Sequence, residues 1–211
     1  MDIKIPYTPR KHQAHLHKQI DKHRWNVLVC HRRFGKTVCM INHLIRSALL
    51  SKLKNPRFAY IAPTFKQAKS IAWDYMKQFT AKIPHTKFNE TELRVDLPNG
   101  ARITLLGSES PDGLRGIYLD GCVIDEYANV NSKLFPEIIR PALSDRKGYC
   151  VFIGTPMGMN NNFYELYQHA QGAEDWFNYK AKASDTKIVD NDELVKAKEV
   201  MGDKKFQQEF E

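Results

Sequence analysis

Short apolar segments, separated by stretches of helical periodicity, are the feature that most constrains the fold of this chain. Two of them, residues 122–124 and 149–153, are continuously apolar and lack the alternation of a half-exposed strand. Such runs are typical of central strands that helices cover on both faces, as in a mostly parallel sheet. Two further strands are predicted at residues 25–30 and 58–61. The sequence therefore predicts an α/β fold with a mostly parallel central sheet flanked by helices.

Helical periodicity fills the intervals between these strands. The apolar spacing predicts helices over about residues 10–23, 35–50 and 64–82. Residues 93–97 and 102–106 instead alternate apolar and polar side chains across Pro98-Asn99-Gly100. Because Asn-Gly accepts the positive φ of a tight turn, this pattern predicts an antiparallel hairpin near residues 93–106.

The chain becomes more polar after Pro156. Helical patterns recur near residues 163–170, 192–201 and 203–211. They predict a small helical subdomain that lies on the sheet. Since no Gly/Ser-rich linker or repeat interrupts the chain, we expect one domain over residues 1–211. Its core would span about residues 1–156, and a C-terminal subdomain or linker about residues 157–211.

Composition limits the possible partners. The 211 residues include 32 Lys and Arg against 24 Asp and Glu, a formal net charge of +8, and 42% of them are hydrophobic. A chain this apolar can bury a full core, which argues against disorder. The excess of positive charge favours a polyanionic partner, nucleic acid first. The apolar runs fall far short of the roughly 20 residues that cross a bilayer, and the start has no apolar signal segment, so neither membrane insertion nor secretion is predicted.

Cysteine and histidine patterns do not predict a metal site. The four cysteines show no C-x-x-C spacing and are expected to be buried, reduced thiols. The histidines near the start are interpreted as polar positions on a helix, because no cysteine or acid completes a tetrahedral set with them. They are His12, His15, His17 and His23.

The segment between the first strand and the following helix fits a phosphate-binding loop. The pattern G-x-x-x-x-G-K-[ST] is matched except at its first glycine. The residues are Cys30, His31, Arg32, Arg33, Phe34, Gly35, Lys36 and Thr37. Gly35 would let backbone N–H groups approach a phosphate at the helix N-terminus, and Lys36 would meet the β and γ charges. The Thr37 hydroxyl would ligate Mg²⁺, so ATP and Mg²⁺ are the expected cofactors.

Two acidic residues, Asp125 and Glu126, follow the buried strand at residues 122–124. Open α/β sheets bind ligands beyond the carboxyl ends of their strands. Asp125 is suited to hold Mg²⁺ through water, and Glu126 to orient and deprotonate the attacking water. We therefore expect the loop ending in Lys36-Thr37 and the two acids to converge, from neighbouring strands, on one magnesium triphosphate.

Taken in order, these motifs resemble those of the N-terminal ATPase domain of the large terminase subunit. This subunit is the motor with which tailed bacteriophages and herpesvirus relatives package DNA into a preformed capsid. Phosphate loops of that family commonly replace the first glycine and carry an arginine, as residues 30–37 do. Residues 59–69 resemble its second motif, and residues 112–116 resemble another. Gly154-Thr155-Pro156 matches its coupling motif, which links hydrolysis to subdomain movement, and the similarity covers about residues 5–211.

The resemblance implies a role for each matching residue. Lys36 and Thr37 would bind phosphate and Mg²⁺, Asp125 would bind Mg²⁺, and Glu126 would be the catalytic carboxylate. The implied nucleotide-binding residues are Gln13, His31, Arg32, Arg33, Phe34, Gly35, Lys36, Thr37 and Thr155. Gln13 belongs to residues 7–13, which resemble a Q-type adenine motif, and would pair with the amino group and a ring nitrogen of the base.

Two arginines compete for the role of arginine finger. Phosphoryl transfer needs positive charge near the departing γ-phosphate. Arg32 lies inside the phosphate loop and can act within its own subunit. Arg115 matches a position where some members of the resembled family place a finger that acts across a subunit boundary. We therefore expect Arg115 to act in trans and Arg32 to sense phosphate in cis, with ordinary salt bridges as the alternative for both.

The resemblance also implies partners and a location. They are double-stranded DNA, a homo-oligomeric ring during packaging, the portal protein and the small terminase subunit, at the procapsid portal in the host cytoplasm. Large terminases carry a further, RNase H-like nuclease domain, and residues 206–211 resemble the approach to it. ATP hydrolysis without DNA cleavage is therefore expected of this chain.

Two other functions remain open from the residues alone. A helicase-like translocase shares the Q motif, the phosphate loop and the Asp-Glu pair, although a complete helicase needs a second motor domain that 211 residues cannot hold. The second open function is a nucleotide-responsive module that binds DNA or assists assembly without turning over ATP. Cys30 in place of glycine is the feature that supports this function.

Overall fold

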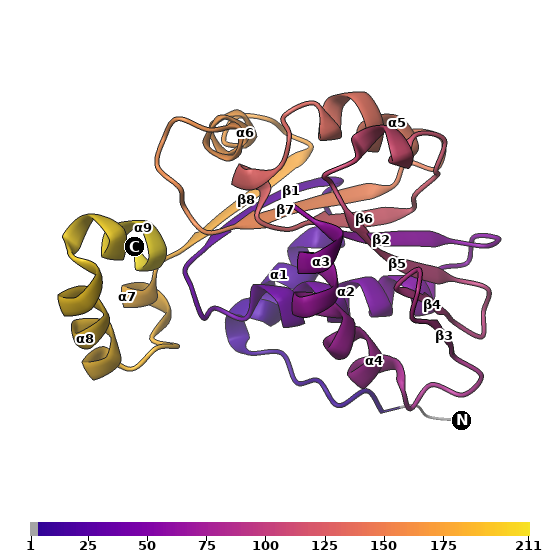
Figure 1. Cartoon of the computed structure of the whole chain (residues 1–211), viewed down its shortest axis with the longest axis horizontal. Helices are drawn as coiled ribbons and strands as arrows, with labels where there is room; N and C mark the ends of the chain where they lie inside the picture. The colour runs from indigo at the N-terminus through magenta and orange to yellow at the C-terminus, as the bar shows by residue number, and fades with distance from the viewer. Residues whose placement is uncertain (1–3) are drawn as a thin grey trace.

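An eight-stranded sheet crosses the molecule with helices on both of its faces (Figure 1). The computed structural model describes residues 4–211. The strands are β1 (Trp25–Cys30), β2 (Arg57–Ala62), β3 (Lys87–Asn89), β4 (Arg94–Asp96), β5 (Arg102–Gly107), β6 (Gly121–Ile124), β7 (Tyr149–Gly154) and β8 (Trp176–Ala181). The α-helices are α1 (Lys11–Ile20), α2 (Lys36–Leu50), α3 (Phe65–Ala68), α4 (Asp74–Thr80), α5 (Arg140–Ala142), α6 (Asn162–Ala170), α7 (Ala183–Thr186), α8 (Asn191–Met201) and α9 (Asp203–Phe210). Within residues 4–211, no helix combines the length and the apolar character that a bilayer-spanning helix needs.

The sheet is parallel over most of its width. The strand order is β3-β4-β5-β2-β6-β7-β1-β8. Every pair from β5 to β8 is parallel, whereas β3-β4 and β4-β5 are antiparallel. The predicted fold class and the predicted hairpin are thereby confirmed. One expectation is wrong: β1, which leads into the phosphate loop, and β6, which leads to Asp125, are not neighbours, because β7 lies between them.

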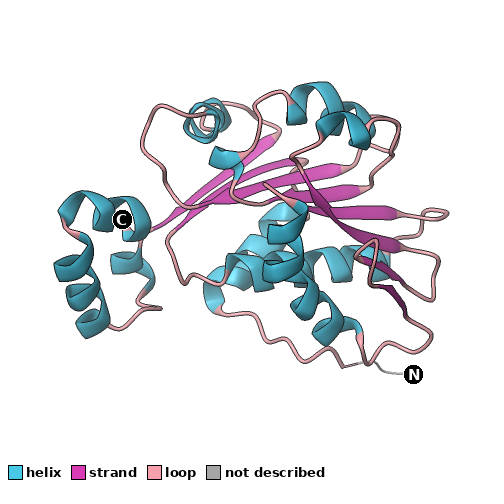
Figure 2. Ribbon diagram, in the orientation of Figure 1, coloured by secondary structure: helices cyan, strands magenta, loops and turns pink. Residues whose placement is uncertain are grey.

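Side chains of the central strands alternate between two apolar cores, which explains why their sequences do not alternate in polarity. On β1, Leu28 and Cys30 enter the core beneath α1, α2 and α4. Val27 and Val29 enter the opposite core, which contains Phe163 of α6. Figure 2 shows the two helical layers on either side of the magenta strands.

The sheet continues past the core boundary that the sequence suggested at residue 156. α6 packs onto the sheet, and β8 pairs in parallel with β1 as an edge strand. After β8, the helices α7, α8 and α9 form a separate cluster at one end of the sheet, in yellow at the left of Figure 1. Their own small core consists of Ala183, Leu194, Phe206 and Phe210. The helical subdomain therefore begins at about residue 183 rather than at 157.

Candidate active site

The loop between β1 and α2 tolerates a cysteine in place of its first glycine because of where that residue lies. Cys30 is the last residue of β1, and its buried side chain packs into the core against α2. Gly35, by contrast, has φ of 87° and ψ of 33°. This left-handed conformation strains residues that carry a Cβ. Gly35 therefore lies where glycine relieves backbone strain, whereas Cys30 lies in a regular strand.

Lys36 folds back over the loop. Its Nζ donates hydrogen bonds to the carbonyl oxygens of Cys30 and His31, at 3.0 and 3.3 Å. The side chains of His31 and Phe34 point into the protein, where 1% and 0% of their surface is exposed. His31 Nδ1 lies 2.6 Å from the Arg32 carbonyl oxygen, and its Nε2 lies 2.8 Å from Thr186 Oγ1. These two side chains anchor the loop, so any nucleotide contact that the two residues make must come from their backbone.

The acidic pair at the end of β6 is held in two different ways. Asp125 is buried, and its carboxylate accepts hydrogen bonds from the Tyr60 hydroxyl and, at 2.9 Å, from the Glu126 backbone N–H. Burial raises the pKa of Asp125, while the Tyr60 hydrogen bond and the Lys36 charge act against the rise. Glu126 has φ of 46° and ψ of 48°, a left-handed conformation that is uncommon outside glycine. Such conformations cluster at functional sites.

The environment of Glu126 favours its protonated form. Burial raises the pKa of Glu126, and the charge of the neighbouring Asp125 raises it further. The Lys36 ammonium and the Thr155 backbone act in the opposite direction. A carboxyl group whose pKa is moved toward neutrality is suited to exchange a proton with water.

A cavity of about 410 Å³ brings residues from four parts of the chain together. Its lining consists of Arg32, Arg33, Lys36, Glu126, Asn129, Thr155, Met157, Lys205, Gln208 and Glu209. The phosphate loop, the end of β6 and the end of β7 thus meet at one place, although β7 separates the other two strands. Because parallel strands end at the same edge of the sheet, the phosphate loop and the acidic pair reach one site although β1 and β6 are not adjacent. The residues from α9 were not predicted.

Tyr60 links the two metal-binding candidates. Its hydroxyl donates to Asp125, and the Thr37 side chain interacts with the same hydroxyl, lowering a Tyr60 pKa that burial and Asp125 hold far above its usual value. Thr37 and Asp125 therefore both lie near the Tyr60 hydroxyl. A hydroxyl and a carboxylate oxygen suit Mg²⁺, which takes oxygen ligands and keeps several waters. Tyr60 was missed as a site residue because it lies within an apolar run typical of a core strand.

Gln13 contacts the phosphate loop from α1. It is 4% exposed, its Nε2 donates to the Gly35 carbonyl oxygen at 3.3 Å, and its Oε1 accepts from the Arg10 N–H at 3.0 Å. Arg10 Nη1 donates to the Phe34 carbonyl oxygen at 3.2 Å. Both ends of the Gln13 amide are therefore engaged by the chain, and its pairing with adenine stays a prediction.

The two candidate arginines lie in different places. Arg32 lines the cavity and forms a 3.7 Å ion pair with Glu209. Arg115 follows a short 3₁₀ turn, Pro111–Leu114, with 58% of its side chain exposed. Its guanidinium pairs with Asp112 at 2.8 Å and Glu137 at 4.0 Å. Arg32 thus lines the cavity and Arg115 lies outside it, although the two side chains are similarly exposed, at 56% and 58%.

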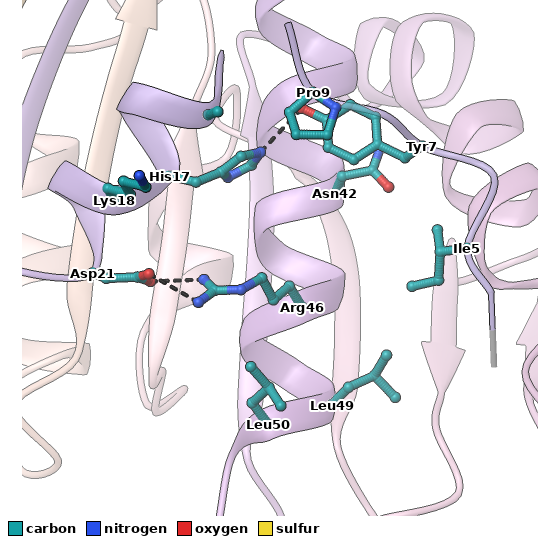
Figure 3. A pocket seen from close by; sticks show the side chains of 11 residues that line it. Ile5, Tyr7, Pro9, His17, Lys18, Asp21, Asn42, Arg46, Leu49 and Leu50 are labelled. Atoms are coloured by element: carbon teal, nitrogen blue, oxygen red, sulfur yellow. Dashed lines mark hydrogen bonds and ion pairs between the residues drawn. The ribbon is translucent and has the colours of Figure 1, made fainter. Parts of the chain in front are cut away.

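A second cavity of about 480 Å³ lies between the N-terminal segment, α1 and α2 (Figure 3). The Tyr7 hydroxyl lies 3.0 Å from His17 Nε2, and Arg46 binds both oxygens of Asp21 at 2.8 and 2.9 Å. His17 Nδ1 also lies 3.0 Å from His43 Nδ1, with the two rings stacked. His17 is therefore a polar position on α1, as the sequence predicted, and its ring contacts Tyr7 and His43. The cavity is lined by apolar atoms and side chains engaged with one another, so we place the chemistry in the first cavity.

Comparison with known proteins gives consistent matches. A family model for the N-terminal part of terminase large subunits of the T4likevirus type matches residues 29–203. The large terminase subunit of Thermus phage G20c is 30% identical over an alignment that covers 51% of this chain and 26% of that protein. The aligned part of this chain therefore spans about a quarter of that relative's length.

Solved structures extend the similarity to nearly the whole chain. The ATPase domain of the large terminase of Thermus phage P74-26 superposes with a TM-score of 0.82 at 22% identity, covering 98% of this chain and 94% of that one. The large terminase of another thermophilic bacteriophage, in complex with ADP, gives a TM-score of 0.81 at 16% identity, covering 95% of this chain and 52% of that one. At these identities the structural matches show the shared fold.

Proposed function

This chain belongs to the family of T4likevirus-type terminase large subunits, N-terminal part, and from that premise we propose that it is an ATPase motor domain. Its reaction is the hydrolysis of ATP to ADP and phosphate with Mg²⁺. The observation that carries the proposal is the meeting of Lys36, Glu126 and Thr155 around one cavity. The ADP-bound large terminase of a thermophilic bacteriophage, which has the same fold, supports a nucleotide as the ligand.

Each side chain has a distinct task in this proposal. Lys36 exchanges its bonds to the loop carbonyls for bonds to phosphate oxygens, and the backbone around Gly35 approaches the phosphates at the start of α2. Thr37 and Asp125 would hold Mg²⁺, and the bound ion would supply positive charge near the phosphates. Glu126 orients the attacking water and accepts its proton.

Thr155 and the arginines complete the site. Thr155 lines the same cavity as Glu126, and its backbone lowers the pKa of that carboxyl group, which fits a coupling role for Thr155. Arg32 senses the phosphates from within the cavity, together with Arg33. Arg115 is exposed and therefore accessible to the site of a neighbouring subunit, where it acts as the arginine finger.

We also propose a biological setting for the chain, based on the family to which it belongs. The substrate moved by the motor is double-stranded DNA, which suits the net charge of +8. The proposed partners are further copies of the chain in a ring, the portal protein and the small terminase subunit, at the procapsid portal in the host cytoplasm. We also propose that these residues do not cut DNA, which an assay of supercoiled plasmid nicking checks.

Steady-state phosphate release tests the enzymatic proposal. Wild type should release phosphate in the presence of Mg²⁺ and ATP. Glu126→Gln removes the base but keeps the shape of the side chain, so it should bind ATP and release phosphate at a background rate. Glu193→Gln makes the same change at an exposed position on α8 and should retain the wild-type rate. Equal, near-background rates in wild type and Glu126→Gln would instead identify a nucleotide-responsive binding module.

Lys36→Ala tests nucleotide binding directly. Because the Lys36 ammonium faces the cavity from the phosphate loop, its loss should abolish ATP binding. Unchanged ATP affinity would remove the basis of the motor proposal. Stimulation of hydrolysis by single-stranded rather than double-stranded DNA would favour the helicase-like alternative.

A further inference from the structure

The last helix carries one face that builds its own core and another that faces the cavity. Phe206 and Phe210 pack with Ala183 and Leu194. Lys205, Gln208 and Glu209 all line the cavity of the candidate active site. Their spacing of three and four residues places these three side chains on one side of α9. The cavity is thus closed on one side by a helix that lies more than 160 residues after the phosphate loop in the sequence.

Glu209 holds two cations in that cavity. One carboxylate oxygen lies 2.9 Å from Lys205 Nζ, and the other lies 3.7 Å from Arg32 Nη1. The Arg32 backbone N–H also donates to the Glu209 carbonyl oxygen at 2.7 Å. Only 13% of the Glu209 side chain is exposed, so its charge is poorly screened and it raises the pKa of Glu126.

Lys205 and Glu209 line the part of the cavity where hydrolysis would occur. Glu126 and Thr155 line the same cavity, whereas Gln13, the adenine candidate, contacts Gly35 on the α1 side of the loop. A terminal phosphate oxygen and a carboxylate oxygen are both strong acceptors for lysine and arginine donors. A triphosphate entering this cavity therefore competes with Glu209 for Lys205 and Arg32.

We propose that Lys205 is a phosphate-binding residue of the ATP site and that Glu209 is an internal competitor for the terminal phosphate. This inference rests on the proposed function. In it, α9 supplies the ammonium that meets the terminal phosphate, and the Glu209 carboxylate must release both cations for that contact to form. Discrimination between ATP and ADP then depends on α9 as well as on the phosphate loop.

The test measures binding of ATPγS and of ADP, each with Mg²⁺, by isothermal titration calorimetry. Lys205→Met should weaken ATPγS binding about tenfold, because a charge-assisted hydrogen bond is lost. Lys204→Met makes the same change at the adjacent, exposed position and should bind like wild type. Glu209→Gln keeps the backbone bond to Arg32 and should bind ATPγS several-fold more tightly, with Glu199→Gln on α8 as its matched control. Both effects should be smaller for ADP.

Three results would overturn the inference. The first is an equal ATPγS affinity of Lys205→Met and Lys204→Met. The second is an equal effect of the Lys205→Met and Glu209→Gln substitutions on ATPγS binding and on ADP binding. The third is weaker ATPγS binding by Glu209→Gln together with a lowered melting temperature of that variant. The last would show that Glu209 only attaches α9 to the loop. Failure of the proposed function has a different signature, since Lys36→Ala would then bind ATPγS as well as wild type does.

Discussion

The Tyr60 hydroxyl on β2 donates a hydrogen bond to the Asp125 carboxylate at the end of the neighbouring strand β6. Tyr60 is fully buried, and Thr37 interacts with the same hydroxyl. The tyrosine therefore positions Asp125, one of the two candidate ligands of Mg²⁺, without being a ligand in the proposal.

Tyr60→Phe should impair the use of Mg²⁺ while leaving the fold intact. Because the lost hydrogen bond lowers the pKa of Asp125, that pKa should rise further and metal affinity at a given pH should fall. We expect hydrolysis to need a higher Mg²⁺ concentration and the acidic limb of its pH profile to move to higher pH. A roughly tenfold loss of rate at limiting Mg²⁺ corresponds to a hydrogen bond to a charged group.

Tyr149→Phe is the matched control for Tyr60→Phe, since the Tyr149 hydroxyl donates to Ser47, away from the candidate site. Equal Mg²⁺ dependence in both variants would contradict this role.

The fold and the main motifs were predictable because their signals are local. Strands β6 and β7 are apolar throughout, and α2 follows directly from the phosphate loop. β8 was missed, although Phe177 and Tyr179 alternate with Asn178 and Lys180, which is the pattern of an edge strand. The polar residues around it hid that signal among helical patterns.

The rest of the site depends on contacts between distant parts of the chain. Tyr60 has the sequence context of a core residue, and a partner for its hydroxyl is fixed only when β6 pairs with β2. Glu209 approaches Arg32 only because β8 pairs beside β1 and brings the chain back to the phosphate loop. No residue spacing within either segment encodes these approaches.

Arg115 and Arg32 should respond differently to protein concentration. Arg115 is exposed and paired with Asp112, so Arg115→Ala should leave nucleotide binding intact and reduce hydrolysis only where subunits meet. Arg32 lines its own cavity, so Arg32→Ala should weaken ATP binding at all concentrations. Phosphate release measured against protein concentration, with oligomeric state followed by light scattering, separates the two. Equal loss of rate for Arg115→Ala in a strictly monomeric preparation would contradict action in trans.

Asp125→Asn should raise stability while it removes activity. Burial raises the pKa of Asp125 above that in the unfolded chain, where it is about 3.9. The folded state therefore binds the proton more tightly, and the stability associated with that proton is lost as pH rises through the folded pKa. At pH 7 a neutral asparagine avoids this loss, so we expect a higher melting temperature.

Hydrolysis by Asp125→Asn should fall on the order of 100-fold or more, because a bound metal ion contributes several kcal/mol to catalysis. Asp145→Asn, at an exposed position, is the control and should change neither property. Calorimetric melting at pH 7 and phosphate release check the two expectations together. A lower melting temperature for Asp125→Asn would show that the ionised carboxylate stabilises the fold.

Because of the stacked pair His17 and His43, the stability of the fold should decrease at mildly acidic pH. Figure 3 shows His17 next to α2. Burial lowers the pKa of His17 to about 4 and that of His43 to about 3. The Arg46 charge contributes to the lowering of both pKa values, and the Asp21 charge opposes it. Below the unfolded pKa of about 6.5 the unfolded chain binds more protons than the folded one, so stability is complete above 6.5 and falls as pH decreases toward 4.

At pH 5 each of these histidines should contribute roughly 2 kcal/mol less stability than at pH 7, from about 1.4 kcal/mol per pH unit. His43→Gln keeps a hydrogen-bonding group beside His17 but does not titrate, so it should flatten the decline by about half. His15→Gln makes the same change at an exposed position of α1 and should keep the wild-type slope. Urea unfolding at pH 7, 6 and 5 measures all three proteins. Equal slopes for His43→Gln and His15→Gln would assign the acid sensitivity to other groups, because the stacked pair would then titrate alike in the folded and unfolded states.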